Sequence, residues 1–188
     1  GERAMNVLIP LAEGVEEIEA VVVVDVLRRA GIAVTTAAVG SERIVAASRG
    51  VTLVADTLWR DVDTGAFDAL VLPGGGPGTE RLKADKRVLE AVAEFDARGK
   101  TVAAICAAPT VLAAAGVLEG RAATCYPGCE KDLKGTRYTA KGPVVSDKHI
   151  LTSQGPGTSF AFALALVERL AGKTTADKVA AGLLYRAG

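Results

Sequence analysis

Aromatic side chains and a net charge are both nearly missing from this sequence. Only 4% of the 188 residues are Phe, Trp or Tyr, so aliphatic side chains must build most of the core. Lys plus Arg (22) equals Asp plus Glu (22), which leaves a formal net charge of zero. A chain without a broad basic field gives no strong signal for binding nucleic acid or an anionic membrane surface. We therefore expect neither class of partner.

Cysteine and histidine are also scarce, with three and one residues respectively. Three cysteines cannot all pair within one chain, and no signal peptide is visible, so we expect a reducing, cytoplasmic compartment. Cys125 and Cys129 have too few potential ligands around them for a zinc site, and we interpret them as free thiols, with a resolving role toward Cys106 as the alternative. The only histidine, His149, follows Asp147 and Lys148, which predicts an exposed strand edge rather than a catalytic role. No metal or cofactor is expected.

One segment, residues 101–118, carries no charge and resembles a membrane span in hydropathy. A bilayer crossing needs about 20 predominantly apolar residues, whereas this segment contains Cys106, Pro109 and Gly116 among many alanines. A buried strand followed by a buried helix has the same profile, because parallel strands are covered on both faces. We therefore predict no membrane span.

Short apolar runs alternate with helix-like segments along the chain. We expect strands at 7–10, 32–39, 67–72, 101–105 and 149–152, a hairpin within 44–54, short strands within 121–145, and helices at 15–30, 83–98, after Cys106, at 157–170 and at 175–184. Such alternation predicts an α/β fold with a mainly parallel sheet and helices on both faces. We expect one domain, residues 5–188, preceded by an expression remnant at residues 1–4.

Cys106 stands between the apolar run 101–105 and a run of helix formers. A thiol at a sharp strand-to-helix turn can face the amides of a helix N-terminus, which favour the reactive thiolate. The alternative is a small buried core residue, since free cysteine is among the most buried residue types. The local sequence leaves both interpretations open.

Glu16, Glu17 and Glu19 begin the first predicted helix, where negative charge also suits the helix N-terminus. Glu19 precedes an apolar stretch, so we expect it to be buried with a raised pKa. A carboxyl group of that kind can donate a hydrogen bond to a thiolate or move protons, which makes Glu19 the candidate partner of Cys106.

The glycine run 73–78 follows a predicted strand. Its amides can approach a ligand closely and, with the amide of Ala107, stabilise an oxyanion. A dinucleotide-binding loop is excluded, because Thr79 stands where the last glycine is needed. A simple tight turn is the alternative.

Four stretches together resemble the ThiJ/PfpI superfamily, in particular its parkinsonism-associated deglycase / YajL-like branch. They are residues 14–19, 72–75, 103–110 and 151–158, and the resemblance covers about residues 5–170. It implies a flavodoxin-like sandwich that forms a homodimer. It also implies the following site: Cys106 and Glu19 as the catalytic pair; backbone amides of Gly74, Gly75 and Ala107; and Glu16, Arg28, Arg49, Tyr126 and Pro156 around the substrate.

The resemblance further implies a cofactor-independent glyoxalase or deglycase, acting on glyoxal, methylglyoxal or their early adducts. The alternative is a redox-sensing protein or chaperone whose Cys106 is oxidised to sulfinate without turnover. A cysteine peptidase is disfavoured, because Ala107 stands where the protease-like branch has histidine. Tyr126-Pro127 replaces the His-Pro pair common in the deglycase branch, so no role of that histidine transfers to this chain.

Overall fold

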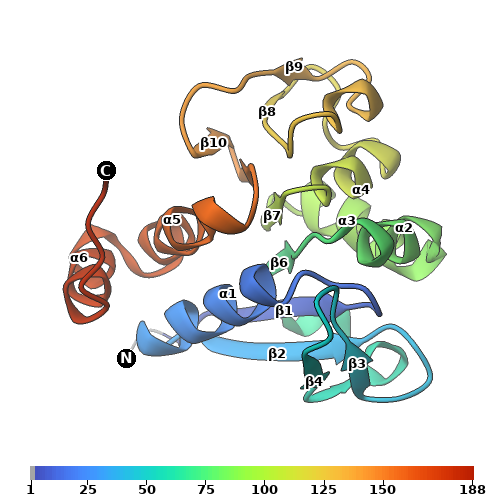
Figure 1. Ribbon diagram of the computed structural model, residues 1–188, viewed down its shortest axis with the longest axis horizontal. Helices are drawn as coiled ribbons and strands as arrows, with labels where there is room; N and C mark the ends of the chain where they lie inside the picture. The colour runs from blue at the N-terminus through green and yellow to red at the C-terminus, as the bar shows by residue number, and fades with distance from the viewer. Residues whose placement is uncertain (1–2) are drawn as a thin grey trace.

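The computed structural model describes residues 3–188, and a seven-stranded sheet forms its centre (Figure 1). Across the sheet the order is β10 (Val144–Asp147), β11 (Ile150–Ser153), β7 (Thr101–Ile105), β6 (Ala69–Leu72), β1 (Asn6–Leu11), β2 (Ala33–Ala38) and β5 (Thr57–Leu58). All neighbouring strands are parallel except β10 and β11. The predicted mainly parallel α/β sheet is confirmed. Of the expected remnant, Gly1 and Glu2 lie outside the described residues.

Six helices accompany the sheet within residues 3–188: α1 (Glu17–Arg29), α2 (Gly76–Ala84), α3 (Lys86–Ala97), α4 (Pro109–Ala114), α5 (Ser159–Ala171) and α6 (Lys173–Gly182). The helix expected at 83–98 is confirmed as α3, although residues 83–84 belong to α2, because Asp85 ends α2 and caps α3 by accepting the Arg87 amide at 2.9 Å. In the described part of the chain, no helix combines the length and apolar character that crossing a membrane requires.

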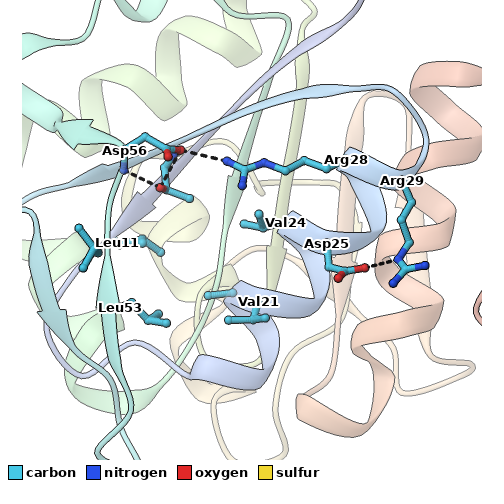
Figure 2. Close-up of a pocket in the computed structure, with 11 residues that line it drawn as sticks. Leu11, Val21, Val24, Asp25, Arg28, Arg29, Leu53 and Asp56 are labelled. Carbon is cyan, nitrogen blue, oxygen red and sulfur yellow. Dashed lines mark hydrogen bonds and ion pairs between the residues drawn. The ribbon is translucent and has the colours of Figure 1, made fainter.

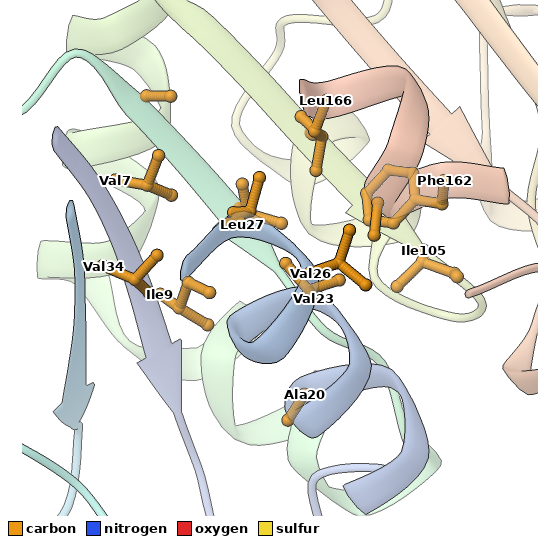
Figure 3. Packing of buried hydrophobic residues seen from close by; sticks show 14 of the residues in the cluster. Val7, Ile9, Ala20, Val23, Val26, Leu27, Val34, Ile105, Phe162 and Leu166 are labelled. Carbon is orange, nitrogen blue, oxygen red and sulfur yellow. The ribbon is translucent and has the colours of Figure 1, made fainter. Parts of the chain in front are cut away.

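Each face of the sheet supports its own hydrophobic core, because successive strand residues point to opposite faces. One core joins α1, α5 and α6 to one face of the strands, and its buried side chains include Val26 of α1 and Phe162 of α5 (Figure 3). The other core joins α3 and α4 to the opposite face, with Phe95 and Leu112 buried. Figure 1 shows α5 and α6 on one side of β6 and β7 and α2–α4 on the other.

Two small sheets and several short 3₁₀ turns complete the fold. The predicted hairpin is β3 (Ile44–Ala46) paired with β4 (Thr52–Val54), and β8 (Ala122–Ala123) pairs with β9 (Arg137–Tyr138). The 3₁₀ turns are Trp59–Asp61, Thr64–Ala66, Glu130–Asp132 and Pro156–Thr158. The short strands expected within 121–145 are thus confirmed.

His149 departs from its expected exposure. Its side chain is only 19% exposed, and its Nε2 lies 2.6 Å from Oδ1 of Asp96, the same oxygen that accepts a hydrogen bond from Arg121 at 2.5 Å. These partners come from distant segments, so local polarity could not reveal them. His149 precedes β11, whereas Cys106 follows the parallel strand β7, so the two residues lie at opposite ends of the sheet.

Candidate active site

Cys106 occupies a strained backbone conformation immediately after β7. Its φ is +67°, a left-handed value that non-glycine residues rarely adopt and that is often found at functional sites. Its amide donates to the Ser153 carbonyl at 3.0 Å, and its carbonyl accepts the Tyr126 amide at 2.8 Å. The strained turn is therefore held by two segments that come later in the chain.

Glu19 is fully buried on the inner face of α1. Its Oε1 accepts the Gly74 amide at 2.9 Å, and its carboxyl group lies close enough to Cys106 to influence the pKa of the thiol. Its Oε2 is buried and has no hydrogen-bond partner among the described residues. One carboxyl oxygen is thus fixed by the backbone, while the other is left without a partner.

Gly74 is the residue that allows this contact. A methyl group at its Cα would lie 2.7 Å from Cβ of Cys106 and 2.8 Å from Oε1 of Glu19. Both distances are shorter than any normal contact, so only glycine leaves room for the carboxyl group beside the cysteine. The glycine run therefore has a packing role here that a simple turn would not require.

The carboxyl group and the thiol perturb each other strongly. Burial raises the pKa of the Glu19 carboxyl to about 7, although the hydrogen bonds from Gly74 and Cys106 act in the opposite direction. Burial, followed by the negative charge of Glu19, raises the pKa of the Cys106 thiol to about 12. A proton on Glu19 removes the charge that most opposes a thiolate, so the two groups titrate as a coupled pair.

The expectation that a helix N-terminus would lower the thiol pKa is wrong in its net direction. The helix α4 begins only at Pro109 and has six residues, so its dipole is small and displaced from Cys106. Two amides, those of Gly75 and Ala107, do lower the pKa of Cys106 through hydrogen bonds, but burial outweighs them. These amides lie where an oxyanion formed beside the sulfur would accept hydrogen bonds.

Glu16 and the loop that carries Arg49 lie at the first turn of α1. Glu16 caps the helix, with Oε1 accepting the Ile18 amide at 3.0 Å and Oε2 accepting from the Ser48 hydroxyl at 3.2 Å. Its own amide donates to the Gly74 carbonyl at 3.0 Å. The Arg49 side chain is exposed and donates only to the adjacent Ser48 carbonyl, so Arg49 borders the first turn of α1 from the β3–β4 loop.

Glu17 was not singled out by sequence reasoning, yet it fastens that loop. Its carboxylate accepts the Ser48 hydroxyl at 2.9 Å, the Arg49 amide at 2.9 Å and the Val51 amide at 3.3 Å. Burial acts to raise the pKa of Glu17, but these hydrogen bonds outweigh burial and hold the pKa below its ordinary value. Only the long-range loop contact distinguishes Glu17 from its neighbours, and the sequence carries no signal for it.

Tyr126 and Pro156 belong to the two segments that hydrogen-bond to the Cys106 backbone, through the Tyr126 amide and the Ser153 carbonyl. The Tyr126 ring is half exposed and packs on Gly155, where a methyl group would lie 3.3 Å from the ring. Pro156 follows at the start of a 3₁₀ turn. The structure therefore brings both residues to the neighbourhood of the thiol.

Arg28 is the expected site residue that the structure places elsewhere. It lies near the end of α1, about 13 Å along the helix axis from Glu19. Its guanidinium donates to Asp56 at 3.1 Å and to the Val34 carbonyl at 3.0 Å, beside a hollow of about 550 Å³ on the outer face of α1 (Figure 2). Within one chain, Arg28 is separated from Cys106.

Comparison with known proteins shows the family of this chain. The sequence model of the DJ-1/PfpI family matches residues 5–169, which include every site residue described above. The chain belongs to the DJ-1/PfpI family. Within residues 3–188, no group of three or more His, Cys, Asp or Glu side chains is placed to hold a metal ion.

Several relatives in the DJ-1/PfpI family are similar over most of this chain. Protein DJ-1 homolog A from Arabidopsis thaliana is 46% identical over 183 residues, which are 96% of this chain and 47% of that protein. The chain thus spans about half the length of that relative. Glutathione-independent glyoxalase DJR-1.2 from Caenorhabditis elegans is 37% identical over 172 residues, which are 91% of this chain and 90% of that protein.

The fold of the DJ-1/PfpI family is also found among solved structures. The crystal structure of Drosophila melanogaster DJ-1beta matches with a TM-score of 0.95 and 41% sequence identity, covering 98% of this chain and 100% of that chain. This agreement confirms the flavodoxin-like α/β fold.

Proposed function

We propose that this chain is a cysteine-dependent glyoxalase or deglycase, acting on glyoxal, methylglyoxal or their early adducts and protecting against carbonyl and oxidative stress. The observation that carries the proposal is the buried Glu19 carboxyl group, which the Gly74 amide holds beside Cys106 and whose Oε2 has no hydrogen-bond partner among the described residues. A carboxyl group with a pKa of about 7 can both donate and accept a proton near neutral pH. A relative named as a glyoxalase supports the same class of reaction.

The proposed reaction begins from the state in which Cys106 is a thiolate and Glu19 carries the shared proton. The sulfur attacks the aldehyde carbon of methylglyoxal, and Glu19 gives its proton to the resulting oxygen, forming a hemithioacetal. The Glu19 carboxylate then removes the hydrogen from that carbon and returns it to the adjacent carbon, while the proton of the hemithioacetal hydroxyl passes to the former ketone oxygen, which leaves a lactoyl thioester. Water hydrolyses the thioester to lactate, one proton returns to the Cys106–Glu19 pair, and a second proton leaves to solvent.

The backbone around Cys106 supplies the remaining assistance. The amides of Gly75 and Ala107 stabilise the oxygen that becomes negative during attack and hydrolysis; removing one such donor typically costs about 10²–10³ in rate. We assign substrate contacts to Tyr126 and Pro156, and also to Glu16 and Arg49 near the first turn of α1. The substrate-binding roles of these four residues are part of the proposal.

Lactate production from methylglyoxal tests the proposal. We expect Cys106→Ser to abolish turnover while the far-ultraviolet circular dichroism stays unchanged, and Glu19→Gln to lower turnover at least 100-fold. Cys129→Ser, assayed under reducing conditions, is the matched control and should keep wild-type activity. Full activity of the Cys106→Ser variant would show that the thiol is not the nucleophile.

A second candidate function, redox sensing or chaperone action without turnover, is favoured by the same two amides and the protonated carboxyl group around one sulfur. These donors would stabilise a Cys106 sulfinate formed with two equivalents of hydrogen peroxide. Mass spectrometry after mild peroxide treatment tests this idea. Oxidation confined to the other two cysteines would exclude it.

We also propose that the protein acts as a cytoplasmic homodimer. Large apolar side chains are exposed together on α1 and on the β3–β4 hairpin, namely Ile18, Val21, Ile44 and Val54, and such a patch is a normal site of association. Light scattering coupled to size-exclusion chromatography checks the state. A single monomeric peak at micromolar concentration would contradict the proposal.

A further inference from the structure

Cys125 precedes and Cys129 ends a tight turn that begins at Tyr126, the residue whose amide donates to the Cys106 carbonyl. The turn is closed by the Cys129 amide, which donates to the Tyr126 carbonyl at 3.0 Å. Pro127 and Gly128 occupy its two central positions, and Gly128 has φ of +98°, as a type II turn requires. The two cysteines are therefore held close by a turn that the sequence itself specifies.

The two thiols also share one environment. Cys125 is fully buried in the core formed with α3 and α4, and Cys129 packs against the same core while remaining partly exposed. Among the charged groups around Cys125, Cys129 has the largest influence on its ionisation. Lys83 and Lys131 lie near Cys129 and favour its thiolate, although burial and nearby acidic groups raise its pKa overall. Cys129 is thus the more accessible and more readily ionised thiol of the pair.

We propose that Cys125 and Cys129 form a reversible intramolecular disulfide when the protein meets hydrogen peroxide. The Cys129 thiolate attacks one peroxide oxygen, and the O–O bond breaks. The other oxygen departs as hydroxide, which takes up a proton to become water, and Cys129 is left as a sulfenic acid. The Cys125 sulfur then attacks that sulfur, loses its proton, and displaces the hydroxyl group as a second water. Two thiols are oxidised by two electrons in total, and one peroxide is reduced to two waters.

The turn couples this pair to the candidate active site. Both cysteines are free thiols in the structure, and a bond of about 2.05 Å between their sulfur atoms would constrain the chain between them. That chain is Tyr126-Pro127-Gly128, and the Tyr126 amide holds the Cys106 carbonyl at 2.8 Å. We expect disulfide formation to weaken this hydrogen bond and thereby loosen the strained backbone that presents Cys106.

Peptide mapping in a Cys106→Ser background tests the disulfide without depending on the proposed enzymatic function. Trypsin releases residues 122–131 as one peptide that contains both cysteines. After peroxide treatment and alkylation, we expect this peptide to carry no alkyl group and to be two hydrogen atoms lighter, and reduction before alkylation should restore both labels. Adding Cys125→Ser should leave Cys129 free to oxidise further to sulfinate, whereas adding Cys129→Ser should leave Cys125 fully alkylated.

A second measurement tests the coupling. Hydrogen exchange of the Tyr126 amide should become at least ten-fold faster after peroxide and return to its original rate after reduction, and the Cys129→Ser variant should show no change. Where turnover is measured, which rests on the proposed function, wild type should show a component of peroxide inhibition that a dithiol reverses.

Full alkylation of both cysteines after peroxide, or a disulfide between different chains, would overturn the proposed intramolecular disulfide. An unchanged Tyr126 exchange rate in the oxidised protein would overturn the coupling.

Discussion

Replacing Glu19 by Gln should stabilise the folded protein at high pH, whereas the same replacement at Glu17, two positions earlier on α1, should destabilise it. The contrast arises because the two carboxyl groups have opposite pKa shifts. Burial raises the pKa of Glu19, while backbone amides and the Ser48 hydroxyl together outweigh burial at Glu17 and lower its pKa. Both substitutions remove one ionisable group and keep nearly the same side-chain shape.

The expected size of the Glu19 effect follows from its pKa. A shift from 4.5 to about 7 means that the folded protein binds a proton that the unfolded chain has already released. At about 1.36 kcal/mol per pKa unit, the free energy of unfolding falls by about 3 kcal/mol as pH rises from about 4.5 to about 7. Gln carries no titrating proton and can still accept the Gly74 amide, so the variant should lose this decline and be more stable above pH 7.

The Glu17 effect has the opposite sign and the opposite pH window. Because its pKa is lowered on folding, the ionised carboxylate contributes stability above the pKa of the unfolded chain, and this contribution is lost as the pH falls. Hydrogen bonds to a charged acceptor contribute about 1.5–3 kcal/mol each, and a neutral amide oxygen replaces them only in part. We expect Glu17→Gln to lose about 1–3 kcal/mol at neutral pH and much less in acid.

Urea unfolding at fixed protein concentration, over pH values on both sides of 7, measures both effects. The series is best made in a Cys106→Ser background, because only one group of the coupled pair then titrates. The reasoning is refuted if Glu19→Gln is no more stable than its parent above pH 7, or if the two variants change stability in the same direction.

Two further stability predictions use matched positions. Gly74→Ala forces a methyl group to within 2.8 Å of Glu19 and Cys106. We therefore expect the free energy of unfolding, measured in urea, to fall by about 1–3 kcal/mol, together with impaired turnover. Gly76→Ala places its methyl group in open space and should behave like wild type. Phe162→Ala removes a fully buried ring between α5 and α1 and should lower the free energy of unfolding by about 3–5 kcal/mol. The Phe160 ring is 40% exposed and stacks on Tyr185, so Phe160→Ala should lower it by less than half as much. Equal losses within either pair would contradict the packing described here.

Much of the fold could be predicted because its strands are short apolar runs separated by helix-like segments. The strand 101–105 was expected with its exact bounds, and β2 and β11 within a residue at each end. The helix α2 could not be predicted, since Gly76-Pro77-Gly78 has the composition of a turn. The helix begins there because proline suits a first turn, where its missing N–H leaves no hydrogen bond unmade.

The sequence predicted that Cys106, Glu19 and the glycine run come together, but not that Arg28 lies elsewhere, nor the electrostatics of the site. Cys106 and the glycine run follow neighbouring parallel strands, so both lie at the carboxyl ends of the strands, and α1 supplies Glu19. The raised thiol pKa depends on how deeply the sulfur is buried and on one carboxyl group from another element. The roles of Glu17 and His149 depend likewise on partners far along the chain, which local sequence does not show.

The two hydrogen bonds that hold Cys106 in its left-handed conformation have a consequence for protein synthesis. The donor on Tyr126 and the acceptor on Ser153 both leave the ribosome after Cys106 itself. At ~5–20 residues per second, Ser153 is added roughly 2–9 s later. During that interval the nascent chain lacks the two hydrogen bonds that hold the Cys106 backbone, so this residue reaches its left-handed conformation only when the last parallel strand has docked.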